Sequence, residues 1–292
     1  MPKRAALLAA VSSIALVAAS GAAGALTITQ DTTGANLLSA LAPNQAQFNS
    51  ISVTYSFGAA SQVGTYAGFT TPPVMIGNGV VLSTGNVVDV VGPANATDTP
   101  STDLGGASTA AIDAYAAGRV TNWNASYDAT VLTVNFSLAN AGAIAFDFVF
   151  GSIEYPNYVN SFADAAFAFL DGQQIIFDAN GNPVHVGTSF TSLLTTGDAN
   201  TAFADPHAML GRLTTTSGTI AAGSHTLEFQ LADTNDGILD SGLFISNFRT
   251  TANSGGPVTE PSDDVPEPGS LAILGLALAL VGFGRRKQGG AS

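Results

Sequence analysis

Apolar and polar residues alternate in several short segments of this 292-residue chain, and a period of two is typical of β-strands. The alternation is clear in residues 51–57, 132–138, 144–150 and 227–231, and a last apolar segment covers 243–249. Side chains in such segments divide into a buried and a more exposed face. Short turns between strands favour antiparallel pairing. The pattern therefore predicts an all-β fold, either an antiparallel β-sandwich or a jelly-roll-like domain.

Two short segments favour helices instead. Leu37, Leu38 and Leu41 lie three and four residues apart within 35–42, and residues 108–117 are rich in alanine. We expect one or two short helices beside the sheets. Residues 26–250 contain no evident linker or repeat, and their length suits one β domain.

Charge and cysteine content exclude several functions. The chain has 8 basic and 21 acidic residues, a formal charge of −13 and no cysteine. Only Arg119, Arg212 and Arg249 lie between the two basic ends. Binding to a phosphate backbone needs a basic surface, so nucleic acid is excluded as a partner. Without cysteine there are no disulfides, thiolate metal sites or cysteine nucleophiles.

The N-terminus has the order of an export signal. Lys3 and Arg4 precede an apolar run over residues 5–19, and the small residues of Ala23–Gly24–Ala25 follow. This order predicts a signal peptide, residues 1–25, that is cleaved after Ala25. The alternative is an uncleaved anchor or a buried helix.

The C-terminus has the order of a membrane-sorting segment. A linker rich in Pro, Gly, Ser and acids covers residues 251–265, and an apolar segment covers 269–284. As a helix this segment would be about 24 Å long, short of a hydrocarbon core of about 30 Å. The basic residues that follow it favour a cytoplasmic end. They are Arg285, Arg286 and Lys287.

Pro266, Glu267 and Pro268, followed by the apolar span and the basic end, resemble the PEP-CTERM sorting signal of Gram-negative bacteria over residues 266–287. The resemblance implies an exosortase-type sorting enzyme as partner and a transient stage in the inner membrane. The mature protein would then reach the cell surface or the extracellular matrix. The alternative is a permanent C-terminal anchor.

Several stretches of the predicted domain resemble the choice-of-anchor L domain family. They are residues 36–38, 79–86 (GVVLSTGN), 102–104, 127–132, 146–156 (FDFVFGSIEYP), 160–170 and 232–245 (ADTNDGILDSGLFI). The chain departs from the family pattern at Ile153, where a second acid is frequent, and at Ala163, where Asn is frequent. The resemblance implies location and architecture. It does not assign a biochemical activity.

Acidic residues gather at the ends of predicted strands and suggest a metal site. Glu154 and Asp164 flank a loop between two apolar strands, and Asp233, Asp236 and Asp240 lie in one short segment. Ca²⁺ takes six to eight oxygen ligands and relieves repulsion between carboxylates. The segment lacks the spacing of an EF-hand and its final Glu. We therefore weigh Ca²⁺ binding by these five acids against a simple role in turns and on a soluble surface.

A catalytic site has weaker support. His185, His207 and His225 lie at turn edges, and the chain has no Gly-x-Ser-x-Gly or His-Glu-x-x-His motif. Glu154 with an acid of the 233–240 segment could form a glycosidase pair. Tyr155 and Tyr158 are candidates for stacking on sugar rings, as are Trp123 and Tyr127, although such residues more often pack at the edge of a core.

Together these features predict an exported, surface-sorted, non-enzymatic β domain that serves adhesion, matrix or ligand binding. Stabilisation by Ca²⁺ is one of the two interpretations of its acids, beside their role in turns and on the surface. A glycan or a matrix protein is the expected ligand. The alternatives are a hydrolase that acts on envelope or matrix polysaccharide and a coat protein that self-assembles.

Overall fold

The computed structural model describes residues 25–70, 74–93, 97–120, 122–159, 161–192, 194–195 and 200–251. The predicted linker, the sorting segment with its span 269–284, and residues 1–24 of the predicted signal peptide lie outside the described residues. Within the described ranges, no helix has both the length and the apolar character needed to cross a bilayer.

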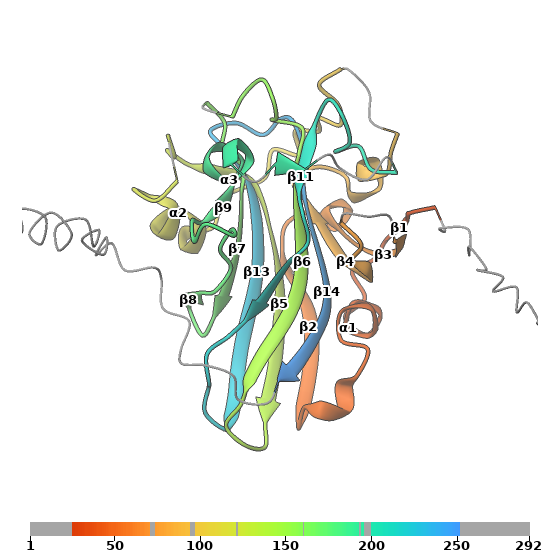
Figure 1. Ribbon diagram of the computed structural model, residues 1–292, viewed down its shortest axis with the longest axis vertical. Coiled ribbons are helices and arrows are strands. Elements are labelled where there is room, and N and C mark those ends of the chain that lie inside the picture. The colour runs from red at the N-terminus through yellow and green to blue at the C-terminus, as the bar shows by residue number, and fades with distance from the viewer. Residues whose placement is uncertain are drawn as a thin grey trace, which may run out of the picture.

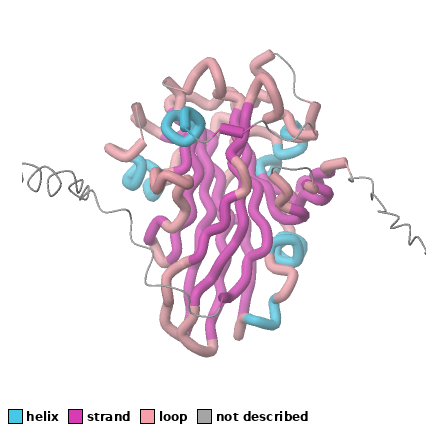
Figure 2. The backbone as a smooth tube through the Cα atoms, viewed as in Figure 1, coloured by secondary structure: helices cyan, strands magenta, loops and turns pink. Residues whose placement is uncertain are grey.

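The described strands form two antiparallel sheets (Figures 1 and 2), as the alternation predicts. The first sheet has the order β1 (Thr27–Gln30), β3 (Val63–Phe69), β4 (Gly77–Ser83), β14 (Ser241–Thr251), β6 (Ala143–Ser152), β11 (Ala208–Leu210) and β10 (Leu194–Thr195), and β12 (Leu213–Thr216) also pairs with β6. The second has the order β2 (Ser50–Phe57), β5 (Ser126–Leu138), β13 (Gly223–Thr234), β7 (Ala165–Leu170) and β8 (Gln173–Gln174), and β9 (Val184–His185) also pairs with β7.

The helices are short and lie at the margins of the sheets (Figure 1). Two were predicted, and they are α1 (Gly34–Leu41) and α2 (Ala110–Ala116). The helix α3 (Val186–Ser192) was not predicted, because its Val, Gly, Thr and Ser residues have low helix propensity. Short 3₁₀ helices cover Gln45–Gln47, Ala60–Gln62 and Val87–Val90.

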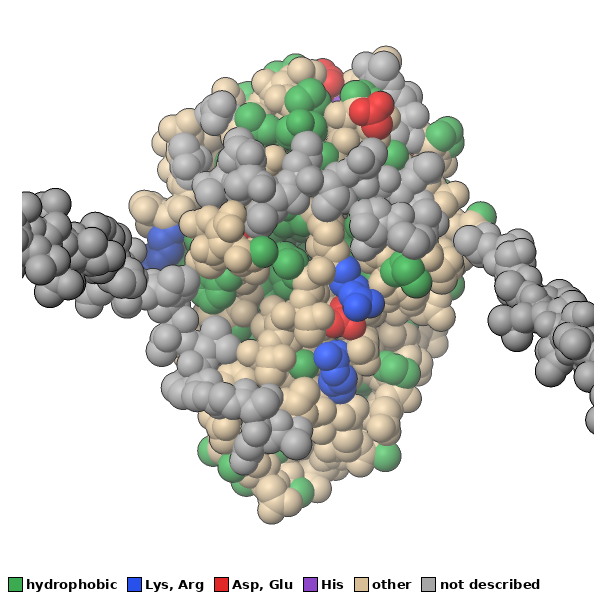
Figure 3. Space-filling view, in the orientation of Figure 1, with side chains coloured by type: hydrophobic (Ala, Val, Ile, Leu, Met, Phe, Trp, Pro, Cys, Tyr) green, Lys and Arg blue, Asp and Glu red, His purple; other side chains and the backbone are tan. Residues whose placement is uncertain are grey.

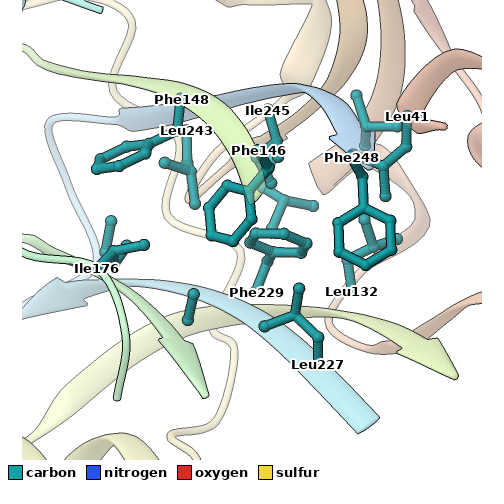
Figure 4. Close-up of a cluster of buried hydrophobic side chains, with 14 of the residues drawn as sticks. Leu41, Leu132, Phe146, Phe148, Ile176, Leu227, Phe229, Leu243, Ile245 and Phe248 are labelled. Atoms are coloured by element: carbon teal, nitrogen blue, oxygen red, sulfur yellow. The ribbon is translucent and has the colours of Figure 1, made fainter. Parts of the chain in front are cut away.

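Phenylalanine rings from both sheets fill the space between them (Figure 4). The ring of Phe146 on β6 meets the ring of Phe229 on β13 edge to face, with 4.8 Å between centroids. The predicted inward face of β6 is confirmed, since Ile144, Phe146, Phe148 and Phe150 all belong to this core. Val149 on the opposite face of β6 lies in a second apolar cluster, so the strand is buried on both sides.

The register of the strands brings several of their ends together. Ser152 near the end of β6 lies opposite Ser241 at the start of β14. Asp233 near the end of β13 lies opposite Tyr127 in β5, and Ala232 lies opposite Ala165 at the start of β7. The residues that follow β6 and β13, and those that precede β7 and β14, therefore meet at one end of the sandwich. We call this end, with its carboxylates, the acidic end.

A candidate cation site at the acidic end

Each acid of this end is placed by the end of a strand. Glu154 follows β6 by two residues, and its backbone N–H donates to the hydroxyl of Ser152 at 3.0 Å. Asp164 immediately precedes β7, and Asp240 immediately precedes β14. Asp233 lies after a β-bulge in the pairing of β13 with β5. A bulge redirects side chains, so Asp233 need not follow the alternation of the strand before it.

Four of the five predicted ligands are completely buried. Glu154, Asp164, Asp233 and Asp240 each have 0% exposure, and Asp236 is half-buried. A role limited to surface turns does not account for these four side chains. More broadly, seven carboxylates of the described residues are buried, and acidic side chains cover little of the face shown in Figure 3. They are Asp128, Asp147, Glu154, Asp164, Asp178, Asp233 and Asp240.

Two of the buried carboxylates have no hydrogen-bond partner. Both side-chain oxygens of Glu154 and both of Asp233 lack one among the described residues, and so does Oδ2 of Asp240. The other oxygen of Asp240 accepts from the backbone N–H of Thr102 at 2.7 Å. A buried polar group without a partner costs free energy, and a buried charge without one costs much more.

Asp164 lies at the centre of the acidic end and is well bonded. Its Oδ1 accepts from the backbone N–H of Thr234 at 3.0 Å, and its Oδ2 accepts from the hydroxyl of Ser241 at 2.7 Å. These bonds connect the start of β7 to the end of β13 and the start of β14. Asp164 therefore ties the two sheets together at this end.

Buried carboxylates elsewhere in the domain are satisfied, which makes the acidic end different. Asp178 accepts from the backbone N–H groups of Asn180 and Asn182 and from the hydroxyl of Ser189. Asp147 accepts from Thr214 and Asn247 in the same way. The fold can thus provide donors for an inward acid, whereas no hydrogen bond to Glu154 or Asp233 is formed, although the hydroxyl of Thr84 lies close to Asp233.

Burial and mutual repulsion hold protons on these groups when no cation neutralises them. Burial raises the pKa of Asp240 to about 7. Burial, followed by the charges of Asp164, Asp236 and Asp98, raises the pKa of Glu154 to about 10. Burial and the charge of Asp164 likewise raise the pKa of Asp233. The acidic end is therefore a place where positive charge would be strongly attracted.

No three His, Asp or Glu side chains in the described part of the chain are arranged so that they could hold a metal ion by themselves. The five predicted ligands thus share one end of the sandwich without converging on one point. Calcium sites also use hydroxyls, backbone carbonyls and water, so two carboxylates can suffice when such groups complete the shell. The orphaned, buried oxygens of Glu154 and Asp233 fit that kind of site.

The structure adds an acid, Asp128, that the sequence did not indicate as a ligand. Asp128 is 1% exposed and accepts from the backbone N–H groups of Leu104 and Gly106. With the Thr102 bond to Asp240, these contacts hold residues 102–106 against the acidic end. Asp128 lies outside the 233–240 segment, so spacing along the chain could not reveal it. The available signal was its place in the stretch 127–132 that resembles a family motif.

Comparison with known proteins decides the family. The family model of the Choice-of-anchor L domain matches residues 27–249, and that of the PEP-CTERM protein-sorting motif matches residues 264–288. The chain belongs to the Choice-of-anchor L domain family. Both resemblances found in the sequence are thereby confirmed. The sorting motif makes the protein an exported one with a C-terminal membrane-anchoring signal, recognised by an exosortase-type sorting enzyme.

The other comparisons add little information about the function of this Choice-of-anchor L domain. A comparison with curated proteins finds no match. Among solved structures, the crystal structure of Se-Met labeled β-glucosidase from Kluyveromyces marxianus is 11% identical, with 42% of this chain and 11% of that chain covered. Its TM-score is 0.23, which is too low to carry any argument.

Most of the aromatic residues predicted to contact a ligand pack against other rings of this Choice-of-anchor L domain. Tyr155 is half-buried and its ring lies 6.1 Å from that of Phe190. Tyr158 packs on Phe162 and donates its hydroxyl to Asp98 at 3.3 Å. The indole N–H of Trp123 donates to Asp113, and its ring meets Phe167. Tyr127 is the more open ring, with 42% exposure.

Proposed function

We propose that this protein is a non-enzymatic module of the cell surface or extracellular matrix, whose β domain is stabilised by Ca²⁺ bound at the acidic end. Its role would be adhesion or ligand binding, with a glycan or a matrix protein as partner. One observation carries the calcium part of the proposal. The carboxylate of Asp233 is fully buried, has no hydrogen-bond partner and lies beside Asp164.

The physical reason is charge compensation. A carboxyl group in the interior must be protonated, paired with a positive side chain or bound to a metal ion. Arg249 lies near Asp147 instead, at 3.9 Å, and Arg212 donates to the backbone of Met75. A hard cation would neutralise Asp164 and Asp233, and hydroxyls of this end such as that of Thr84 are suitable further ligands. Extracellular modules bind Ca²⁺ with Kd values of about 10⁻⁴ to 10⁻³ M.

The geometry of the histidines favours a binding role over catalysis. His225 and Asp171 form a pair at 2.7 Å beside a hollow of about 290 Å³, which resembles the start of a catalytic relay. The other ring nitrogen of His225, however, faces the backbone carbonyl of Ala221 at 3.0 Å. It is therefore not directed at a nucleophile, as a general base must be. Both ring nitrogens of His207 likewise face backbone carbonyls, those of Tyr155 and Thr97.

Two exposed apolar residues support an interaction surface at the acidic end. Tyr127 is 42% exposed and lies opposite Asp233 in the strand pairing. Ile238 is 44% exposed and lies in the loop between Asp236 and Asp240. Aromatic and apolar side chains next to polar groups are typical of binding surfaces. A cation that orders these loops would also order that surface.

The test is calcium titration of the full chain, purified in detergent and stripped of metal. Calorimetry and thermal melts would compare the wild type with Asp233→Asn and with Asp171→Asn, a control that removes one charge. Asp171 has a φ of 50°, which Asn tolerates, and it lies in the turn after β7. We expect Ca²⁺ to raise the Tm of the wild type and the control, and to do so much less for Asp233→Asn.

In chelator the order should reverse. Asp233→Asn should then melt above the wild type near neutral pH, because the wild type must take up a proton to bury this carboxyl and the neutral amide need not. Absence of binding heat together with an unchanged Tm would overturn the calcium proposal. Sugar release from matrix polysaccharide that is abolished in Glu154→Gln would support the hydrolase alternative instead.

A further inference from the structure

We propose that a hollow beside Trp123 is a binding site for a neutral glycan. This inference rests on the proposed ligand-binding role, and it names both the site and the class of ligand. The hollow has a volume of about 530 Å³, within the range of about 300–1,000 Å³ that is usual for ligand sites. Trp123 lines it together with the polar residues Asn122, Asn124, Ser161 and Asn235.

Three loops at the acidic end form this hollow. The segment between α2 and β5 carries Trp123, Ser161 lies between β6 and β7, and Asn235 directly follows β13. The side-chain nitrogen of Asn235 donates to the carbonyl of Asn122 at 2.9 Å and to that of Ser161 at 3.1 Å. Its side-chain oxygen accepts from the backbone N–H of Asn124 at 3.0 Å. One side chain thus ties the three loops together, and a site that is ordered in advance binds at a lower entropy cost.

The indole ring of Trp123 forms a fixed wall of the hollow. Its N–H donates to Oδ1 of Asp113 on α2 at 3.2 Å, and its ring meets the ring of Phe167 on β7 at an interplanar angle of 80°. These contacts hold the ring in place while the residue stays only half-buried. A flat apolar ring of this kind suits the C–H face of a sugar.

Neutral hydrogen-bonding groups beside the ring complete the match to a sugar. Among the residues that the structure describes, the side-chain oxygen of Asn124 accepts no hydrogen bond, and the side-chain hydroxyl of Ser161 has no partner. Both residues are exposed and line the hollow. Amide and hydroxyl groups both donate and accept, so they can pair with the hydroxyls of a sugar.

The charges around the hollow favour a neutral ligand over an acidic one. None of the described residues that line it is charged. Arg119 is close to it in sequence, but its guanidinium lies 4.7 Å from the centre of the Tyr115 ring and donates to the carbonyl of Tyr115 at 3.1 Å. The formal charge of the chain, −13, repels acidic polysaccharides. A neutral glycan is therefore the class of ligand that this site fits.

The test uses Trp123 as its probe, because it is the single tryptophan of the chain. The full chain, in a detergent without a sugar headgroup and with Ca²⁺ present, would be titrated with cellohexaose, laminarihexaose, maltohexaose and mannohexaose. We expect at least one of these neutral oligosaccharides to shift the tryptophan emission saturably and to shield the indole from quenching by acrylamide. Hyaluronan oligosaccharides, which carry carboxylates, should do neither.

A double variant tests the location of the site. Asn124→Ala combined with Ser161→Ala should weaken binding of the responding oligosaccharide roughly tenfold, because two hydrogen bonds are lost while Trp123 remains as the probe. Both side chains are exposed, so the Tm should not change. The matched control is Asn135→Ala, since Asn135 is also exposed but lines the other hollow, beside His225. It should bind like the wild type.

The outcomes separate this inference from the proposed function. Absence of a response to all four neutral oligosaccharides overturns the glycan site and leaves calcium binding, which has its own titration, intact. Calorimetric affinity that is equal in the wild type and the double variant overturns the location at Trp123 and leaves glycan binding as a function of the domain. A stronger response to hyaluronan oligosaccharides than to the neutral ones overturns the class of ligand.

Discussion

The carboxylate of Asp240 lies directly against the α-carbon of Gly85, so closely that a β-carbon on Gly85 would overlap both oxygens of that carboxylate. Gly85 follows the end of β4 by two residues, and its backbone does not adopt a positive φ. Glycine is required here by space and not by backbone conformation. The contact allows a charged group to approach the main chain at the acidic end.

Gly85→Ala should therefore displace Asp240 and disturb the acidic end. We expect a loss of about 1–3 kcal/mol in the free energy of unfolding, as for other overpacked sites, and weaker Ca²⁺ binding. Urea denaturation and calorimetry would measure the two effects. Gly142→Ala is the matched control, because a β-carbon there meets only backbone oxygens at 3.9 Å. Equal behaviour of the two variants would contradict the expectation.

The stability of the metal-free protein should fall as the pH rises. Burial raises the pKa of Asp240 from 3.8 to about 7, so the folded state holds this proton more tightly than the unfolded chain. The corresponding stability is fully present below about pH 4 and is lost as the pH rises through about 7. Glu154, with its pKa raised to about 10, should extend the fall to higher pH.

Urea denaturation of the metal-free protein across this range would measure the slope, which should be smaller in Asp240→Asn. Ca²⁺ competes with these protons, so the stabilisation that it provides should grow with pH. The expectation fails if Asp240→Asn and the wild type have the same pH dependence, or if calcium stabilises more at low pH than at high pH.

Phe229→Ala should remove the centre of the core between the sheets. The ring is fully buried and meets Phe146 edge to face. We expect a loss of about 3–5 kcal/mol in the free energy of unfolding, measured in urea. Phe57→Ala should cost much less, since Phe57 is 37% exposed near the edge of the second sheet. Similar losses in the two variants would mean that the core is not where the structure places it.

Glu267→Ala should block sorting without affecting the β domain. Glu267 lies inside the sorting motif at 264–288, and the upstream Glu260 provides a control outside it. We expect Glu267→Ala to accumulate as an uncleaved form in the inner membrane, as judged by fractionation and mass spectrometry, whereas Glu260→Ala is processed normally. Equal processing of both would contradict recognition of the motif through this residue.

Much of the fold could be predicted because strand patterns are local. The alternating segments at 51–57, 132–138, 144–150 and 227–231 all lie within strands, and the inward face of β6 is the predicted one. The helix α1 followed from the leucine spacing, which is also local. Helix α3 was missed because its sequence has no helical pattern and tertiary contacts decide its conformation.

The candidate site could be predicted only in part. The sequence placed Glu154, Asp164 and the 233–240 acids at strand ends, and the register of the strands shows that these ends meet. It could not reveal that Asp164 has donors on two other strands while Asp233 has none. It also could not connect Asp128 or Asp98 to the site, since both come from distant segments.

The amino-acid sequence by itself determined the strands, the acids at their ends and the sorting motif, because periodicity and short motifs act over neighbouring residues. Only the tertiary structure decided which strands pair, which carboxylates are buried and which of them lack partners. Those properties depend on contacts between residues far apart in the chain, such as Ser152 with Ser241 and Gly85 with Asp240. The burial of an unpaired carboxylate results from packing, and no local pattern specifies it.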